Sequence, residues 1–347
     1  MKRLHALQYL RAIAALIVVY SHAAIQITEW KSLLPYTGAY GVDIFFVISG
    51  FIMVYITKPN DTPVNFMVNR VRRVVPLYWF FTLLMGIILF TLPSLFKTGE
   101  FSWAALFQSL FFIPHYSLQN PEFVWPIVAP GWSLNYEMYF YCLFAMSLVL
   151  APQFRVAFII AAISLIWAVF NIIGSNAAIP RFIADPTVFE FVAGMLLAVA
   201  WKRGFVLSNL TGWVFFIAGF ILATVAPDTM HHWLRISIPS TMIVVGCLFL
   251  KVPVSKFGLM LGDASYAIYL SHIFVLGGLR FLVPADAAAT AANAWLFVLA
   301  SVLISTLIGI VVHFVIDNWL LREERLNLFK GARSSTDTTP EANEARR

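Results

Sequence analysis

Apolar residues follow one another along most of this chain in long, uninterrupted runs instead of alternating with polar ones. A helix needs roughly 20 apolar residues to cross a bilayer, and long continuous runs favour helices over strands. The pattern therefore predicts an all-α integral membrane protein with about ten transmembrane helices around a polar intramembrane cavity. The predicted spans are 8–28, 39–57, 74–95, 132–151, 156–174, 186–201, 209–226, 235–250, 259–283 and 293–321.

Two segments do not fit a membrane span. The apolar stretch 103–113 is too brief to cross and is expected at the interface, within an aromatic and proline-rich loop, 96–131, that could roof a cavity. The tail 331–347 is polar, has no apolar periodicity and is expected to be a disordered cytoplasmic tail. Residues 1–330 then form one transmembrane domain.

Composition supports a lipid environment. Hydrophobic residues make up 61% of the chain and charged residues 12%, whereas a soluble domain carries about 25% charged residues. Nucleic-acid binding is excluded as the main function despite a net charge of +6. The two cysteines, Cys142 and Cys247, each lie in an apolar run and indicate neither a disulfide framework nor a zinc site, so no metal is expected.

The positions of the basic residues predict the orientation of the chain. With ten spans, 17 of the 23 lysines and arginines fall on the side of both termini, four fall on the other side and two lie inside spans. Basic residues collect on the cytoplasmic side of a bilayer, so both termini are expected in the cytoplasm. A cleaved signal peptide is the alternative for the N-terminus, but Arg11 and His22 fit such a segment poorly.

The first predicted span carries two basic side chains, Arg11 and His22. Eleven residues correspond to three turns plus about 20°, so both side chains point the same way, about 16 Å apart along the axis. Ionisable groups inside a bilayer are costly and usually face a pathway or a site. A snorkelling arginine and a structural histidine are the alternative, which the shared face makes less favourable.

Three other spans place carboxylates close to the outer face. Asp43 lies in the second span, where it could hold a cation or orient a histidine, and the adjoining Ser49 and Gly50 favour close helix packing. Glu137 lies in the fourth span and must be paired or protonated there. Glu190 lies one turn into the sixth span, where a bracing hydrogen bond is as good an interpretation as chemistry.

Further polar residues complete the candidate site. Arg70, Arg72 and Arg73 lie at the cytoplasmic start of the third span, which suits a polyphosphate as well as ordinary anchoring. The ninth span carries a polar stripe, which borders a cavity more often than lipid. The possible lining residues of the site are Trp132, Ser133, Tyr266, Tyr269 and His272, together with Asp43 and Glu190.

These segments together resemble the acyltransferase 3 family of integral-membrane carbohydrate acyltransferases. The resemblance covers about residues 5–321 and rests on the Arg-x10-His of 11–22 and the Phe-Phe-Val-x-Ser-Gly-Phe of 45–51. The opening Leu-Gln-Tyr-Leu-Arg-Ala of 7–12 looks most like the branch that acetylates bacterial exopolysaccharide. The tenth span departs from the family, because it has Asp-Asn-Trp at 317–319 where a Glu and a Pro are often found.

The resemblance implies transfer of an acetyl group from cytoplasmic acetyl-CoA to a hydroxyl of a carbohydrate or lipid-linked glycan, in a bacterial inner membrane. It implies acyl-donor handling by Arg11 and His22 and a basic approach at Arg70 and Arg73. From the residues, we expect CoA phosphates on Arg70, Arg72 and Arg73.

The chemistry expected of these residues centres on His22. An imidazole in an apolar site stays neutral and can take the proton of a sugar hydroxyl. Glu137, or with less support Asp43, could orient that ring or share its proton. Covalent acetyl transfer through His22 is an equal possibility.

The competing class of protein is a proton-coupled transporter or exporter, in which the same groups form a relay. The sequence, however, has no internal repeat, and the arginine cluster has no evident role in transport.

Overall fold

The computed structural model describes residues 4–26, 40–96, 98, 100–227, 229–282 and 291–317. Within these ranges the chain forms helices and connecting turns and no β-strand, which confirms the all-α prediction. The helices are α1 (His5–Gln26), α2 (Tyr40–Ile56), α3 (Pro63–Thr91), α4 (Trp103–Leu110), α5 (Trp132–Ser147), α6 (Pro152–Ile173), α7 (Ala178–Ile183), α8 (Phe189–Lys202), α9 (Asn209–Val225), α10 (Ile238–Phe249), α11 (Lys256–Leu282) and α12 (Ala291–Val312).

Five helical segments are long and apolar enough to cross a membrane: α1, α3, α6, α11 and Ala292–Val315. Apolar helices of 10–17 residues occur at Tyr40–Ile56, Asn209–Val225 and Trp233–Phe249. The remaining two predicted spans correspond to α5 and α8, of 16 and 14 residues. Each predicted span thus overlaps a helix, while the number that cross the bilayer stays a prediction. The predicted tail 331–347 lies outside the described residues.

Helix α3 begins eleven residues before the predicted span, and this corrects the placement of the arginines. Thr62 caps the helix by accepting a hydrogen bond from the backbone N–H of Asn65 at 3.2 Å, and Pro63 occupies the first turn. Arg70, Arg72 and Arg73 therefore lie in the interior of a helix and not at its start. Hydropathy detects only the apolar part of a helix. It therefore did not reveal the polar N-terminal part of α3, which is also helical.

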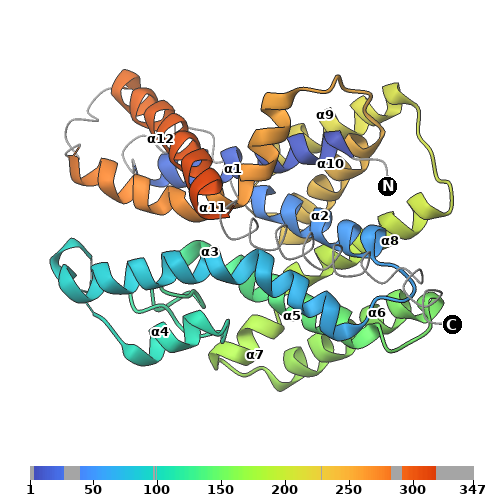
Figure 1. The fold of residues 1–347 in the computed structure, drawn as a ribbon, viewed down its shortest axis with the longest axis horizontal. Helices are drawn as coiled ribbons and strands as arrows, with labels where there is room; N and C mark the ends of the chain where they lie inside the picture. Colours follow the sequence, from blue (N-terminus) through green and yellow to red (C-terminus); the bar gives the residue numbers. More distant parts are fainter. Residues whose placement is uncertain are drawn as a thin grey trace, which may run out of the picture.

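The helices divide into a central and a peripheral set (Figure 1). Half or more of the apolar window of α1 and α11 is buried by other helices, and most of α2 is buried as well. In contrast only 11% of the window of α6 is buried, and α6 and α9 expose rows of large apolar side chains such as Ile172 and Leu210. Exposed apolar surface of this extent requires lipid around the outer helices, so this is a membrane protein.

Two glycines bring α2 and α8 into backbone contact. A Cβ atom on Gly50 would lie 2.1 Å from the carbonyl oxygen of Phe191, and one on Gly194 would lie 2.0 Å from the carbonyl oxygen of Val47. Only glycine fits at either position. The close approach predicted from Ser49 and Gly50 is therefore confirmed, and it places Asp43 and Glu190 at the same end of a tightly packed helix pair.

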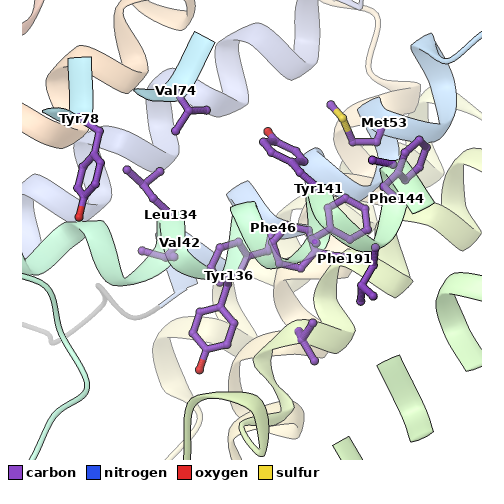
Figure 2. Packing of buried hydrophobic residues seen from close by; sticks show 14 of the residues in the cluster. Val42, Phe46, Met53, Val74, Tyr78, Leu134, Tyr136, Tyr141, Phe144 and Phe191 are labelled. Atoms are coloured by element: carbon purple, nitrogen blue, oxygen red, sulfur yellow. The ribbon is translucent and has the colours of Figure 1, made fainter. Parts of the chain in front are cut away.

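Apolar side chains from α2, α3, α5 and α8 form the main core (Figure 2). The ring of Phe46 lies 4.7 Å from that of Phe191 and 6.0 Å from that of Tyr136, measured between centroids. These buried aromatic contacts fix α5 against α2 and α8. As a result α5 presents its polar residues, Ser133 and Glu137, between α2 and α11.

The predicted interfacial segment forms α4, a helix of eight residues that packs on α3. Tyr78 donates a hydrogen bond to the carbonyl of Ser109 at 2.9 Å, and Trp79 donates one to the carbonyl of Leu110 at 2.7 Å. His115, further along the same loop, is buried beside Ser109. These bonds attach the loop 96–131 firmly to α3.

Candidate active site

A cavity of about 90 Å³ lies between α1, α2, α3, α5 and α11. We call it the arginine cavity, because three guanidinium groups reach it. Its polar lining comes from Arg11, Ser49, Arg70, Arg73, Ser133, Glu137, Tyr141, Tyr266 and Tyr269. Apolar residues of α2, among them Phe45 and Ile52, form much of the remaining wall. A volume of this size has room for several water-sized groups.

Arg11 reaches the cavity from α1 and is held by a chain of polar contacts to α11. Its Nη1 donates a hydrogen bond to Gln8 Oε1 at 3.0 Å, and the amide nitrogen of Gln8 in turn contacts the carboxylate of Asp263. Gln8 lies one turn before Arg11 on the same helix. The guanidinium is thus oriented by its own helix and by α11 before any ligand binds.

Arg70 brings two unsatisfied donor nitrogens to the cavity. Its guanidinium carbon lies 5.7 Å from the centre of the Phe66 ring, in a cation–π arrangement. Its Nε and Nη1 are buried without a hydrogen-bond partner among the described residues. Arg72 and Arg73 are both exposed residues, but Arg73 lines the cavity and Arg72 does not. The structure therefore brings two of the three predicted arginines to the site.

Glu137 lies in the wall of the cavity and not beside His22. Its Oε1 accepts hydrogen bonds from Ser49 Oγ, at 3.2 Å, and from the hydroxyl of Tyr141. Its charge opposes those of Arg11 and Arg70. With three arginines and one carboxylate, the lining keeps an excess of positive charge, which suits an anionic ligand.

His22 pairs with His272 of α11. Nδ1 of His22 lies 2.7 Å from Nε2 of His272, and the two rings are parallel with centroids 4.9 Å apart. Nδ1 of His272 lies 2.6 Å from the carbonyl oxygen of Tyr269. The sequence predicted a polar role for His272, but the partner expected for His22 was a carboxylate, and the structure gives the ring a second imidazole.

The hydrogen-bond network fixes where the protons of this pair reside. A carbonyl oxygen only accepts, so Nδ1 of His272 carries a hydrogen and Nε2 of the neutral ring is an acceptor. Nδ1 of His22 must then donate to it, which leaves Nε2 of neutral His22 with a free lone pair. The pair thus prepares His22 to act as a base or a nucleophile at that one nitrogen.

Tyr269 connects the arginine cavity to the histidine pair. Its ring lines the cavity and lies 6.0 Å from that of His272, between centroids. Its hydroxyl donates to the carbonyl of Pro130 at 2.8 Å and lies 2.9 Å from Ser133 Oγ. His22 itself is not among the cavity's lining residues, so Arg11 and His22 do not face one open space, and Tyr269 and His272 lie between the cavity and His22.

The other predicted residues take different positions. Tyr266 lines the cavity and donates to the carbonyl of Val74 at 2.7 Å, which ties α11 to α3. Trp132 packs edge-on against Phe46, with centroids 6.1 Å apart, and acts as a core residue. His313 is buried near the end of the described part of the chain.

Asp43 and Glu190 meet each other and His232, a residue that sequence reasoning left without a role. His232 Nε2 lies 3.3 Å from Asp43 Oδ1 and 3.6 Å from Glu190 Oε1. Within the described ranges this is the one group of three residues whose potential metal-ligating atoms all lie within 4.8 Å of one another. The sequence suggested that Asp43 could hold a cation or orient a histidine, but no local pattern links three residues on separate helices, so its partners were not predicted.

These features define a class: a helical membrane protein in which a cation-lined cavity adjoins an imidazole with a free nitrogen. Comparison with known proteins gives the family. The model of the acyltransferase domain of the acyltransferase 3 family matches residues 4–314. The chain belongs to this family, and it is an acyltransferase.

The names of similar proteins agree with this family assignment. The chain is 35% identical to the exopolysaccharide production protein ExoZ of Rhizobium meliloti, over 83% of this chain and 91% of that protein. It is 24% identical to the acyltransferase MdmB of Streptomyces mycarofaciens, over 92% of each. It is 28% identical to the putative peptidoglycan O-acetyltransferase YrhL of Bacillus subtilis, over 58% of this chain and 34% of that protein. No solved structure matches the chain.

Proposed function

We propose that the protein transfers an acetyl group from cytoplasmic acetyl-CoA to a hydroxyl of an exported or cell-surface polysaccharide. The names of its relatives support the acceptor: one takes part in exopolysaccharide production and another is a putative peptidoglycan O-acetyltransferase. The polysaccharide, free or still lipid-linked, would meet the acetyl group inside the bacterial cytoplasmic membrane. Family membership favours this function over the transporter considered from sequence.

The observation that carries the proposal is that two guanidinium nitrogens of Arg70, Nε and Nη1, are buried without a partner among the described residues. Buried donors are nearly always hydrogen-bonded, so two buried, unpartnered nitrogens on the half-buried Arg70 call for an anionic partner. Phosphate suits the planar fork of arginine, and Arg73 and Arg11 add charge nearby. The phosphates of CoA would lie against α3, with Arg72 at the exposed rim, and the pantetheine arm would extend past Arg11.

His22 would carry out the proton transfer. Its Nε2 takes the proton of the glycan hydroxyl as that oxygen attacks the thioester carbonyl carbon. The carbon–sulfur bond then breaks, and the departing thiolate takes the proton from the imidazolium, leaving free CoA and an acetyl ester. Positioned proton transfer of this kind contributes about 10²–10⁴ in rate.

His272 would act on this step as a positioning residue. It accepts the Nδ1–H of His22 and so holds the reactive tautomer, and it stabilises the imidazolium through a charge-assisted hydrogen bond. A covalent route uses the same nitrogen: Nε2 of His22 attacks the thioester and passes the acetyl group to the acceptor in a second step. Glu137 would keep Tyr141 and the arginines in place around the donor.

The proposed topology places this site between the two faces of the membrane. The ten helical spans enclose it, and residues 1–330 form the transferase domain. The excess of basic residues on the side of the termini supports a cytoplasmic location for both ends. Acetyl-CoA would then approach along α3, and the acceptor would come from the opposite face.

The test uses the full chain in proteoliposomes with acetyl-CoA labelled in the acetyl group and polysaccharide from the host cell. We expect label in the polysaccharide with the wild type and with Arg203→Gln, an exposed control outside the site, and none with folded His22→Ala. Label held by the protein in the absence of acceptor would select the covalent route. Full activity of His22→Ala, or no transfer by the wild type, would refute the proposal.

A further inference from the structure

The cluster of Asp43, Glu190 and His232 joins three helices that are distant in sequence. Asp43 lies in the first turn of α2 and Glu190 in the first turn of α8. His232 immediately precedes the π-helical turn Trp233–Ser237, which continues into α10. Three segments thus each contribute one metal-ligating side chain at the point where their helices begin.

Burying two carboxylates at one point costs free energy unless a cation compensates their charge. The Asp43 residue is 4% exposed and the Glu190 residue 1% exposed. A helix N-terminus stabilises each carboxylate separately. It does not explain why the two are directed at one another, since neighbouring carboxylates repel when both are ionised. A divalent cation between the two buried carboxylates would allow both to ionise.

The hydrogen bonds of the cluster leave part of it unsatisfied. Glu190 Oε1 accepts a hydrogen bond from Ser237 Oγ at 2.7 Å, while Oε2 is buried with no partner among the described residues. His232 Nε2 can donate one hydrogen, and its 3.6 Å separation from Glu190 Oε1 is too long for a hydrogen bond. The described part of the chain therefore leaves Glu190 incompletely paired.

The spacing of the three ligand atoms fits a transition-metal ion. At zinc bond lengths of about 2.0–2.1 Å, tetrahedral ligand atoms lie about 3.3–3.4 Å apart. The separations from His232 Nε2 are 3.3 and 3.6 Å, and all three atoms lie within 4.8 Å. Ser237, bonded to Glu190, supplies the kind of outer contact that orients a ligating carboxylate.

We propose that Asp43, Glu190 and His232 bind a zinc ion that fastens the starting ends of α2, α8 and α10 together. The His232 side chain is 42% exposed, so a water molecule can take the fourth position. The site is separate from the arginine cavity and its role is structural, so it does not depend on the proposed acetyl transfer. The prediction that the protein has no metal rested on the two cysteines, which do not indicate a zinc site. It did not consider this combination of carboxylate and histidine ligands.

The competing occupant is a proton. The hydrogen bond to Asp43, and next the nearby carboxylate of Glu190, raise the pKa of His232 to about 10, so an imidazolium between the carboxylates could replace the metal. Zinc must displace that proton, and its binding then releases it. The two occupants are therefore distinguished by measuring the metal itself.

The experiment measures zinc in the full-length protein purified in detergent without chelator and then supplied with zinc. We expect about one zinc ion per chain in the wild type and in His231→Ala, whose imidazole neighbours the cluster but does not belong to it. His232→Ala and Asp43→Asn should bind at least about tenfold more weakly. Cobalt, used in place of zinc, should give the visible spectrum of a tetrahedral site with the same dependence on these residues.

The melting temperature provides a second measurement that does not require the ligand variants to be stable. A chelator should lower it in the wild type and in His231→Ala, and added zinc should restore it. No zinc in the wild type, or equal zinc in His232→Ala and His231→Ala, would overturn the proposal and leave the imidazolium as the occupant. Acetyl transfer is not the readout, so failure here is distinguishable from failure of the proposed function.

Discussion

The imidazole rings of His22 and His272 lie parallel, with Nδ1 of the first 2.7 Å from Nε2 of the second. His272 is fixed in turn by the carbonyl of Tyr269. A backbone carbonyl therefore determines, through two rings, which nitrogen of His22 is free. In serine proteases a carboxylate fixes the tautomer of the catalytic histidine, and here a neutral ring takes that place.

The first prediction concerns this pair. His272→Ala removes the acceptor that holds the tautomer of His22, so we expect kcat for acetyl transfer to fall by about 10²-fold or more, with little change in KM for acetyl-CoA. His272→Gln should recover part of the loss, because its amide oxygen can accept the Nδ1–H of His22. Steady-state kinetics in proteoliposomes measure both constants. Equal kcat in the alanine variant and the wild type would contradict the positioning role.

The second prediction separates the arginines of α3. Arg70→Gln removes buried charged donors, each worth about 1.5–3 kcal/mol, so KM for acetyl-CoA should rise about 10–100-fold. Arg72→Gln should have a much smaller effect, since Arg72 is exposed and does not line the cavity. Titration with acetyl-CoA at saturating acceptor measures the difference. Similar effects of the two substitutions would show that the phosphates bind at the surface and not in the cavity.

Local spacing predicted the geometry of α1. The separation of Arg11 and His22 placed both on one face, and in the structure both are linked to α11, through Gln8 and Asp263 in one case and directly to His272 in the other. Such a prediction succeeds because helical periodicity is a property of the local chain. Except at α3, hydropathy likewise located the starts of the apolar helices to within a few residues.

Contacts between distant segments could not be predicted in this way. The partner of His22 was expected to be Glu137, because a carboxylate commonly orients an imidazole, yet Glu137 contacts Ser49 and Tyr141. The start of α3 was not predicted because its first residues are polar. The Thr-Pro pair at 62–63 is nevertheless a recognisable helix-capping signal. Finding the role of His232 required knowing that three helices begin at one place.

The third prediction tests the contact between α2 and α8. Gly50→Ala places a methyl group 2.1 Å from a backbone oxygen, which side-chain movement cannot relieve, so we expect a loss of about 1–3 kcal/mol in stability. Gly277→Ala in α11 is the control, because a Cβ there meets nothing within 4 Å. It should stabilise the helix by up to about 1 kcal/mol. Thermal unfolding in detergent compares the two, and an unchanged melting temperature for Gly50→Ala would exclude the close contact.

The last prediction is a pH dependence that originates in the loop 96–131, outside the spans. Burial lowers the pKa of His115, and the hydrogen bond to the carbonyl of Tyr116 only partly opposes this. The neutral ring links two bonds: Nδ1–H donates to that carbonyl at 3.0 Å, and Nε2 accepts from Ser109 Oγ at 3.0 Å. Ser109 Oγ in turn accepts from the backbone N–H of Ile127 at 2.9 Å. Protonation of Nε2 turns it from an acceptor into a donor, so the bond donated by the Ser109 hydroxyl is lost and can re-form only in the opposite direction.

The sign of the effect follows from the two states of the chain. The pKa of His115 in the folded protein lies below the unfolded value of about 6.5, so the unfolded chain takes up the proton first as the pH falls. The stabilisation by the neutral ring is fully present above about pH 6.5 and is lost progressively below it. Melting temperatures between neutral and mildly acidic pH should therefore fall more steeply for the wild type than for His115→Gln, which cannot take up that proton. His231→Gln, which changes an exposed histidine, should follow the wild-type curve, and parallel curves for all three proteins would show that His115 does not contribute.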